Sequence, residues 1–344
     1  MHRSMKELIG KALTVTGPVE PEVLGKVMMH EHLYVDCNNW EPPAREKTKP
    51  AFRDLIVREG FPFIKKCNDY GCHAFVDASF MPGRADAAFY REAAEATGMH
   101  IILCTGFYRE VELGTYWARK PEYQIWPYVR EASVEQLAEY CVREIVEGIG
   151  GSSMRAGAIK LGSSGPVFTP AEEKAFRAGA RAQKETGVHI TTHCTNKVAA
   201  FAQLLLLDEE GVDLSRVAIG HIGWSLGEKA FREACIPWMK RGASILPTNL
   251  GIGDDGGERY RSLVDGIHRL FDAGVGDRLG LGLDSSFCDQ MEDGIFRYDN
   301  VPPPPWLHMF THTLPAFRKL GLTAEEEDWM MRRNPQRIIP VQKV

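Results

Sequence analysis

Eight short runs rich in β-branched and apolar residues alternate with longer stretches of helical periodicity, and this alternation limits the folds open to the chain. Strands that alternate with helices pair in parallel, because each helix returns the chain to the edge where the next strand begins. The pattern therefore predicts an α/β fold built on a parallel sheet. The expected strands cover residues 27–33, 74–79, 101–107, 158–162, 189–194, 217–222, 243–247 and 279–283. The expected helices cover residues 85–97, 134–148, 171–186, 199–210, 227–241 and 259–273.

One phrase occurs twice, as EATGMHI at 95–101 and KETGVHI at 184–190. Each copy ends a helix at a glycine, which accepts the left-handed conformation that closes a helix, and then enters a strand. His100 and His189 thus lie at strand beginnings, away from the strand ends where ligands gather, and we expect both to be structural. Eight such units in ~320 residues favour a closed (β/α)8 TIM barrel over an open sheet.

The 344-residue chain is long enough for one such barrel or for two ordinary domains. No linker rich in proline and glycine divides it, because the prolines at 302–305 follow the last expected strand and fit a stiff part of a long loop. We predict a single domain over 1–344, with an N-terminal lead-in at 1–25 and a C-terminal helix within 323–338. Thr323 and Glu326 form a capping-box pattern at the start of this helix, which we expect to stop near Asn334-Pro335.

Charge and composition argue against several classes of protein. A formal charge of -5, without a basic stripe, argues against a nucleic-acid partner. No stretch approaches the ~18 apolar residues of a membrane span, and residues 1–7 lack the apolar segment of a secretory signal. The eight cysteines are scattered without a Cys-x-x-Cys pair, as expected of reduced thiols. These features predict a cytoplasmic globular protein that associates with neither nucleic acid nor membrane.

The tripeptide His30-Glu31-His32 ends the first expected strand. Alternate side chains of a strand share a face, so both histidines can point one way while Glu31 points the other. Two neighbouring imidazoles can bind one divalent metal, but two ordinary strand-end histidines would give the same pattern. The motif therefore needs further ligands to indicate a metal site. Glu31 is expected to be a structural carboxylate or one that supports the ligands.

Four further polar residues, Lys160, His193, His221 and Asp284, stand at the ends of other expected strands. In a parallel barrel these strand ends share one mouth, where active sites form. A lysine buried in an apolar strand has a lowered pKa that favours the neutral amine. Such a lysine either pairs with a carboxylate, binds a phosphate, or reacts with carbon dioxide to give a carbamate with two anionic oxygens for two metals.

The ordered set of residues resembles the phosphotriesterase-like family of the amidohydrolase superfamily, which includes phosphotriesterase-like lactonases. The resemblance extends from about Thr14 to Ile338. The matching segments are MHEHL at 29–33, IK at 159–160, SSG at 163–165, TH at 192–193, IGH at 219–221, GLD at 282–284 and NPQR at 334–337.

This resemblance implies a binuclear metallohydrolase and assigns six metal ligands. These are His30, His32 and Asp284 for one metal, His193 and His221 for the other, and N6-carboxylated Lys160 as the bridge. Zinc is the first expectation, and Mn2+, Co2+ or Fe2+ also suit the ligands. A hydroxide that bridges the metals, with a pKa lowered to about 7, attacks the substrate while Asp284 accepts its proton. Lys160 and Asp284 are thus the expected catalytic residues, and the resemblance also implies a homodimer.

Residues just after the strands are candidates for substrate binding. Tyr108 resembles a tyrosine that family lactonases carry near the substrate, although ordinary aromatic packing is the alternative. Trp224 and Phe287, each three residues after an expected ligand, are candidates to line an apolar pocket or are packing residues. Asp77, at the end of the second strand, is expected either to support a ligand histidine or to cap a helix.

One departure from the lactonase pattern follows the seventh expected strand. Family lactonases commonly carry an arginine there, whereas residues 246–251 contain none and the next is Arg259. The loop 289–305 also combines charged residues with prolines, and it is either a specificity loop or a solvated lid. The departure weakens a lactonase assignment and makes a charged or hydrogen-bonding substrate credible.

Three functions remain open for this sequence. The first is hydrolysis of a carboxylic ester or lactone, and the second is hydrolysis of a phosphotriester or an N-acyl amide at the same site. Each reaction needs a hydroxide and a Lewis acid, so the fold alone does not choose between them. The third is a non-catalytic binding protein, which predicts a broken ligand set, yet all six positions are filled. We expect a hydrolase of a small molecule.

Overall fold

The computed structural model describes residues 1–35, 48, 50–79, 83–110, 126–251, 257–288, 297–299 and 306–344. Its central feature is a sheet in which seven parallel strands, β3 to β9, follow one another in chain order. Two short strands extend this sheet beyond β3, with β10 parallel to β3 and β11 antiparallel to β10. The strands are β1 Ala12–Thr14, β2 Gly17–Val19, β3 Lys26–Val35, β4 Cys72–Asp77, β5 His100–Phe107, β6 Ala158–Ser163, β7 His189–Cys194, β8 Val217–Gly220, β9 Ser244–Leu246, β10 Ser286–Cys288 and β11 Arg297–Asp299.

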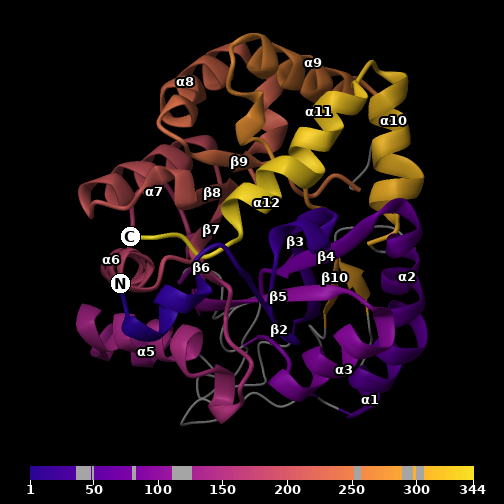
Figure 1. The fold of residues 1–344 in the computed structure, drawn as a ribbon. Coiled ribbons are helices and arrows are strands. Elements are labelled where there is room, and N and C mark those ends of the chain that lie inside the picture. The colour runs from indigo at the N-terminus through magenta and orange to yellow at the C-terminus, as the bar shows by residue number, and fades with distance from the viewer. Residues whose placement is uncertain are drawn as a thin grey trace.

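Helices lie around the outside of the sheet (Figure 1). In α9, for example, Leu263, Ile267 and Leu270 recur at intervals of three and four and form one buried stripe. Of the described helices, none is both long and apolar enough to cross a bilayer. The helices are α1 Pro50–Leu55, α2 Phe61–Lys66, α3 Ala87–Thr97, α4 Trp126–Glu131, α5 Val134–Val146, α6 Pro170–Thr186, α7 Lys197–Glu209, α8 Lys229–Lys240, α9 Glu258–Asp272, α10 Leu314–Lys319, α11 Ala324–Asp328 and α12 Asn334–Ile338.

The α/β fold with a parallel sheet is confirmed, and the first seven expected strands correspond to β3 through β9. The repeated glycine turn is also confirmed, because Gly98 (φ 74°) closes α3 and Gly187 (φ 77°) closes α6. His100 and His189 begin β5 and β7, as predicted. Their position at the opposite end of the strands from the candidate ligands agrees with a structural role.

The eighth expected strand, 279–283, is not a regular strand, although one isolated bridge links it to β9. Its backbone contacts both neighbours. On one side the N–H of Gly282 donates to the carbonyl of Pro247 at 3.2 Å, and on the other the N–H of Met29 donates to the carbonyl of Leu281 at 2.8 Å. The segment therefore lies between β9 and β3, the two edges of the seven-stranded sheet.

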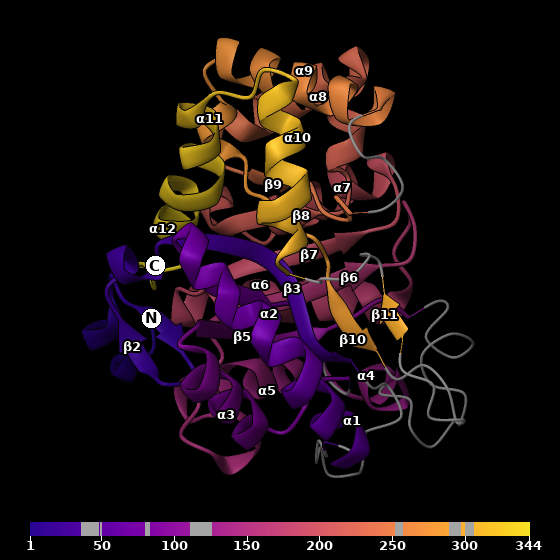
Figure 2. The ribbon, with the colours of Figure 1, turned by 90° about the vertical axis from the view of Figure 1, so that its right-hand side faces the viewer.

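A side chain on β3 accounts for the irregularity of this segment. The N–H groups of Leu283 and Ser285 donate to the side chain of Glu31 instead of to a neighbouring backbone carbonyl. Asp284 between them has a φ of 59°, which interrupts extended backbone. The short strand β10 lies beside β3 (Figure 2); it begins at Ser286, opposite His32, and its register shifts before Cys288.

The C-terminal helix begins as predicted, with Thr323 and Glu326 forming a capping box at the start of α11. The expected stop near Asn334-Pro335 is wrong, because the helical backbone continues to Ile338. A π-helical turn over Trp329–Arg333 precedes the proline, and the helix continues past the proline without a break.

Replacing Gly282 with alanine tests how closely segment 279–283 approaches β3. An added Cβ would lie 2.8 Å from the Cβ and carbonyl oxygen of His30, so the segment would have to move away from the strand. We expect Gly282→Ala to lower the free energy of unfolding by about 1–3 kcal/mol, measured by urea denaturation. Gly165→Ala is the control, because no atom lies within 4 Å of its added Cβ. Equal stability of the two variants would contradict the close approach.

Candidate metal centre

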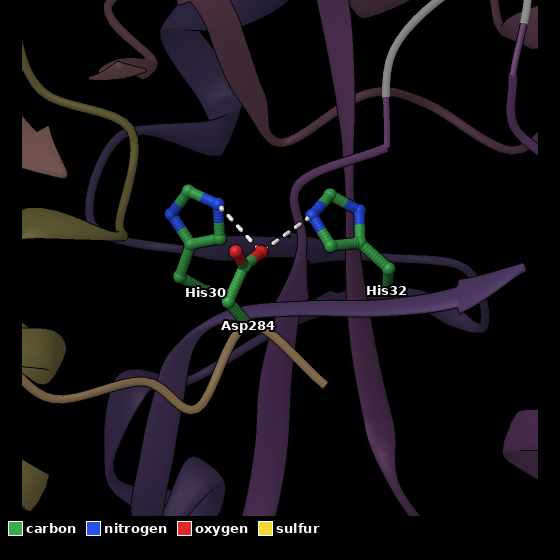
Figure 3. A group of neighbouring side chains, drawn as sticks. All are labelled: His30, His32 and Asp284. Carbon is green, nitrogen blue, oxygen red and sulfur yellow. Dashed lines mark hydrogen bonds and ion pairs between the residues drawn. The ribbon is translucent and has the colours of Figure 1, made fainter. Parts of the chain in front are cut away.

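His30 and His32 point from β3 toward Asp284, which lies between them (Figure 3). The Oδ1 atom of Asp284 is 3.0 Å from Nε2 of His32 and 3.6 Å from Nε2 of His30. One potential ligand atom from each residue lies within 4.8 Å of the other two, and all three residues are buried. Residues 252 positions apart in the chain thus meet at one group of metal-binding atoms.

The other three expected ligands lie at neighbouring strand ends. Lys160 on β6 is buried, and its Nζ is 2.9 Å from Nε2 of His30. The ring centre of His221, just after β8, is 4.7 Å from that of His30 and 4.1 Å from that of His193 on β7. His193 is half-buried, so the cluster is accessible to solvent at this residue, whereas the side chain of His221 is 7% exposed.

Hydrogen bonds around His32 determine which ring nitrogen carries its proton. The hydroxyl of Ser79 donates to the carbonyl of Tyr34 at 3.1 Å, so its oxygen accepts from Nδ1 of His32 at 3.0 Å. In the neutral ring Nε2 then keeps a lone pair, and this lone pair faces the carboxylate of Asp284 at 3.0 Å. Two acceptors at this distance need a cation or an additional proton between them, so this position fits a metal.

His221 is held in a comparable way. Its Nδ1 lies 3.0 Å from the hydroxyl of Thr248 and 3.1 Å from the side-chain amide of Asn249. Its other nitrogen, Nε2, and Nδ1 of His30 are buried without a hydrogen-bond partner among the described residues. Buried polar atoms normally have partners, so Nε2 of His221 also fits a site that binds metal, whereas in His30 it is Nε2, not Nδ1, that faces Asp284.

Glu31 points away from His30 and His32 and positions Asp284, the third residue of their group. Its carboxylate accepts the N–H of Leu283 at 2.7 Å and the N–H of Ser285 at 2.8 Å. Burial raises the pKa of Glu31 well above its usual value, whereas these two hydrogen bonds act in the opposite direction. The two bonds hold both neighbours of Asp284 and so fix the backbone that presents its carboxylate.

Asp77 supports the site from the next strand. It accepts the N–H of Leu33 at 2.7 Å and the N–H of Ser79 at 3.0 Å. Capping of α3 falls to Asp86 instead. Because Ser79 contacts His32, Asp77 acts on the histidine through Ser79, which is close to the supporting role expected for it.

Burial dominates the protonation states of the cluster. It lowers the pKa of Lys160 to about 8 and that of His221 to about 4, and it lowers the pKa values of His30 and His193 well below their usual range. Burial alone would raise the pKa of Asp284, but His221 and the other surrounding basic groups hold it below its usual value. At neutral pH His30, His193 and His221 are therefore neutral and Asp284 is ionised, which are the states that bind metals.

Tyr108 lies beside a candidate ligand, with its hydroxyl 3.0 Å from Nδ1 of His193. The sequence reasoning singled out this tyrosine but missed the hydroxyl groups of Ser79 and Thr248, which contact His32 and His221. All three residues lie just after the ends of their strands. A search for side chains with hydroxyl groups at those positions would have found them.

Trp224 packs against the start of α9. Its ring stacks on Tyr260 with 5.6 Å between ring centres, and the guanidinium carbon of Arg259 lies 3.9 Å from its ring centre. Phe287 has its backbone in β10, but its side chain and most of the loop 289–305 lie outside the described residues. The substrate-binding roles of Trp224, Phe287 and this loop stay predictions.

The phosphotriesterase family profile matches residues 10–339 of the chain. The chain belongs to the phosphotriesterase family. This confirms the resemblance seen in the sequence.

Relatives and solved structures agree with this assignment. The phosphotriesterase homology protein of Escherichia coli is 30% identical over 319 residues, which cover 90% of this chain and 96% of that protein. The N-acetyltaurine hydrolase of Rattus norvegicus is 27% identical, covering 96% of this chain and 98% of that protein. The structure of an organophosphorus hydrolase from Deinococcus radiodurans, 29% identical, aligns with a TM-score of 0.79 over 97% of this chain and 98% of that one. A mutant PTE-like lactonase from the same organism, also 29% identical, aligns with a TM-score of 0.76 over 95% and 99% of the two chains.

Replacing Glu31 with glutamine tests its role in holding Asp284. The amide keeps the shape but offers one acceptor oxygen instead of two, so one N–H of the 283–285 segment loses its partner. We expect a loss of about 1–3 kcal/mol in the free energy of unfolding, measured by urea denaturation, because a buried donor is left unpaired. Glu233→Gln on the exposed face of α8 is the control and should change stability by less than about 0.5 kcal/mol. If the two variants are equally stable, Glu31 does not hold this segment.

Proposed function

We propose that this member of the phosphotriesterase family is a binuclear metal-dependent hydrolase. The observation that carries the proposal is the pair of acceptors formed by Nε2 of His32 and the Asp284 carboxylate, 3.0 Å apart, with His30 beside them. Relatives named as an N-acetyltaurine hydrolase and an organophosphorus hydrolase support the reaction class.

The proposed ligands form two groups with a shared bridge. His30, His32 and Asp284 would hold one cation, and His193 and His221 the other. When bound, two divalent cations would supply a nucleophilic water near neutral pH and would polarise the oxygen of the scissile group. Imidazole and carboxylate ligands suit zinc first, and manganese, cobalt or iron also fit.

Lys160 is the proposed bridge in its N6-carboxylated form. With its pKa lowered to about 8, a fraction of the side chain is the neutral amine at neutral pH. The nitrogen lone pair of that amine forms a bond to the carbon of carbon dioxide, and the nitrogen releases one proton. The resulting carbamate carries one negative charge shared by two oxygens, so it would turn a buried base into an anionic ligand.

Other residues act on the substrate and on the proton. Asp284 accepts the proton that the attacking water loses, because its carboxylate is ionised and lies at the centre of the cluster. The hydroxyl of Tyr108, beside His193, can donate a hydrogen bond to the substrate from the accessible side. Trp224 and Phe287 are retained as proposed pocket residues.

Ester or lactone hydrolysis is the first proposed reaction, supported by the PTE-like lactonase whose structure aligns with this chain. Hydrolysis of an N-acyl amide is the second, supported by the N-acetyltaurine hydrolase relative and by the missing arginine in residues 246–251. Phosphotriester hydrolysis would use the same site, as the name of the Deinococcus organophosphorus hydrolase suggests.

The fold proposed to support this chemistry is a complete (β/α)8 barrel in one domain. Its eighth strand would be segment 279–283, because that segment bonds to both β9 and β3. The family resemblance further supports a homodimer, and the sequence features support a cytoplasmic location.

Metal analysis tests the binuclear centre. Purified protein should contain close to two divalent ions per chain by plasma mass spectrometry, and one or none would refute the binuclear proposal. We expect Lys160→Ala to lose tight metal loading and activity, because it removes the bridging group. Lys229→Ala, at an exposed position of α8, is the control and should retain both. If Lys160→Ala also retains both, Lys160 is not a bridging carbamate.

A substrate panel tests which bond is cut. Lactones, aryl esters, dialkyl aryl phosphates and N-acyl amides should be assayed with the zinc, manganese and cobalt forms. We expect an ester or lactone to give the highest kcat/KM. A leading amide or phosphotriester would replace that assignment, and no turnover of any class would argue against a hydrolase.

A further inference from the structure

Arg109 places a permanent positive charge beside the accessible half of the metal centre. It directly follows Tyr108, whose hydroxyl contacts His193, and its guanidinium carbon lies 5.4 Å from the centre of the Tyr108 ring. Lys160, the base inside the cluster, is fully buried, whereas Arg109 is half-buried, with its Nε atom buried.

The backbone around Arg109 is anchored on both sides. On one side Tyr108 contacts His193, and on the other the N–H of Glu110 donates to the buried carboxylate of Glu172 at 2.8 Å. The same carboxylate oxygen accepts the N–H of Ser164 at 2.9 Å, so it ties the ends of β5 and β6 together. The backbone of Arg109 is therefore held in place before a substrate arrives, which lowers the entropy lost when its side chain binds a ligand.

A guanidinium is well suited to a particular class of ligand. Its planar set of donors matches the oxygens of a carboxylate or a sulfonate, and it stays charged at every physiological pH. Residues 246–251, after β9, contain neither lysine nor arginine, and Thr248 and Asn249 there contact His221. Arg109 instead places a cation on the β5 side of the centre.

We propose that Arg109 is a specificity-determining residue that binds a carboxylate or sulfonate group of the substrate, so that the enzyme prefers acidic substrates to neutral ones. The proposal rests on the hydrolase function proposed above and adds the substrate class. The scissile bond lies at the metals, and the anionic group extends toward the end of β5. The N-acetyltaurine hydrolase relative agrees with this, because its named substrate is an N-acyl amide with a sulfonate.

Matched pairs of substrates test the preference. 4-Nitrophenyl butyrate and mono-4-nitrophenyl glutarate differ by a terminal carboxylate, and N-acetylpropylamine is compared with N-acetyl-β-alanine and with N-acetyltaurine. For Arg109→Met we expect kcat/KM to fall about 10- to 100-fold for the anionic members and to stay unchanged for the neutral ones. Arg109→Lys should recover part of the loss, and Arg58→Met, an exposed control, should behave as wild type. An equal loss for neutral and anionic members, or no loss for either, would overturn the proposal.

Binding without turnover separates this inference from the proposed function. Calorimetry with propane-1-sulfonate, butyrate and the uncharged methyl propyl sulfone should show binding of an anion by the wild-type metal-loaded protein, weakened by Arg109→Met. The stronger of the two anions identifies which group the site prefers. Such binding in a protein that hydrolyses nothing would refute the hydrolase function and keep the anion site. Turnover without any charge preference, or anion binding equal in wild type and Arg109→Met, would refute the anion site and keep the hydrolase.

Discussion

The buried carboxylate of Glu31 accepts hydrogen bonds from the N–H groups of Leu283 and Ser285. These two bonds join β3, which carries two of the proposed ligands, to the segment around Asp284, some 252 residues later in the chain. They occupy N–H groups that a regular strand would use in its ladder, although the segment still bonds to β3 through the N–H of Asp284 and the carbonyl of Ser285. The backbone turns at Asp284 and places its carboxylate between two histidines. A regular strand could not present the carboxylate in this way, because a φ of 59° is incompatible with extended backbone.

Hydrogen bonds also position the histidines of the cluster. Each of three histidines contacts a hydroxyl from a residue just after a strand: His32 contacts Ser79, His193 contacts Tyr108, and His221 contacts Thr248. These contacts orient the imidazoles before a metal binds. They also leave acceptors facing one another and buried nitrogens without partners among the described residues, an arrangement that is costly without a cation. Metal binding would relieve this cost, so we expect it to stabilise the folded protein.

Periodicity predicted the seven strands β3 to β9 because parallel strands buried on both faces are continuous apolar runs. It predicted that His30 and His32 share a face, because strand alternation is a local property. It could not predict that segment 279–283 would be irregular, because the cause is a side chain on β3. The helix stop at Asn334-Pro335 was wrong for a related reason, since a π-helical turn ahead of the proline is not visible in the residue pattern. Periodicity and strand alternation therefore identified the candidate ligands. The residues that hold these ligands could not be identified in this way, because they depend on which strands become neighbours.

The fold constrains the metal ligands more closely than it constrains the substrate. The charge around the site narrows the class of substrate further. The whole chain carries a formal charge of -5, yet Arg109 lies over the ring of Tyr108, whose hydroxyl contacts His193 in the cluster. Two divalent cations would add more positive charge than Asp284 and a lysine carbamate together remove. A site with this sign concentrates anions over neutral molecules, and it does so before any specific contact forms. A neutral ester would gain only from polarisation at the metals, whereas an acidic substrate would also gain from this field and from the guanidinium. The arrangement of charge thus favours acidic substrates whichever bond the enzyme cuts.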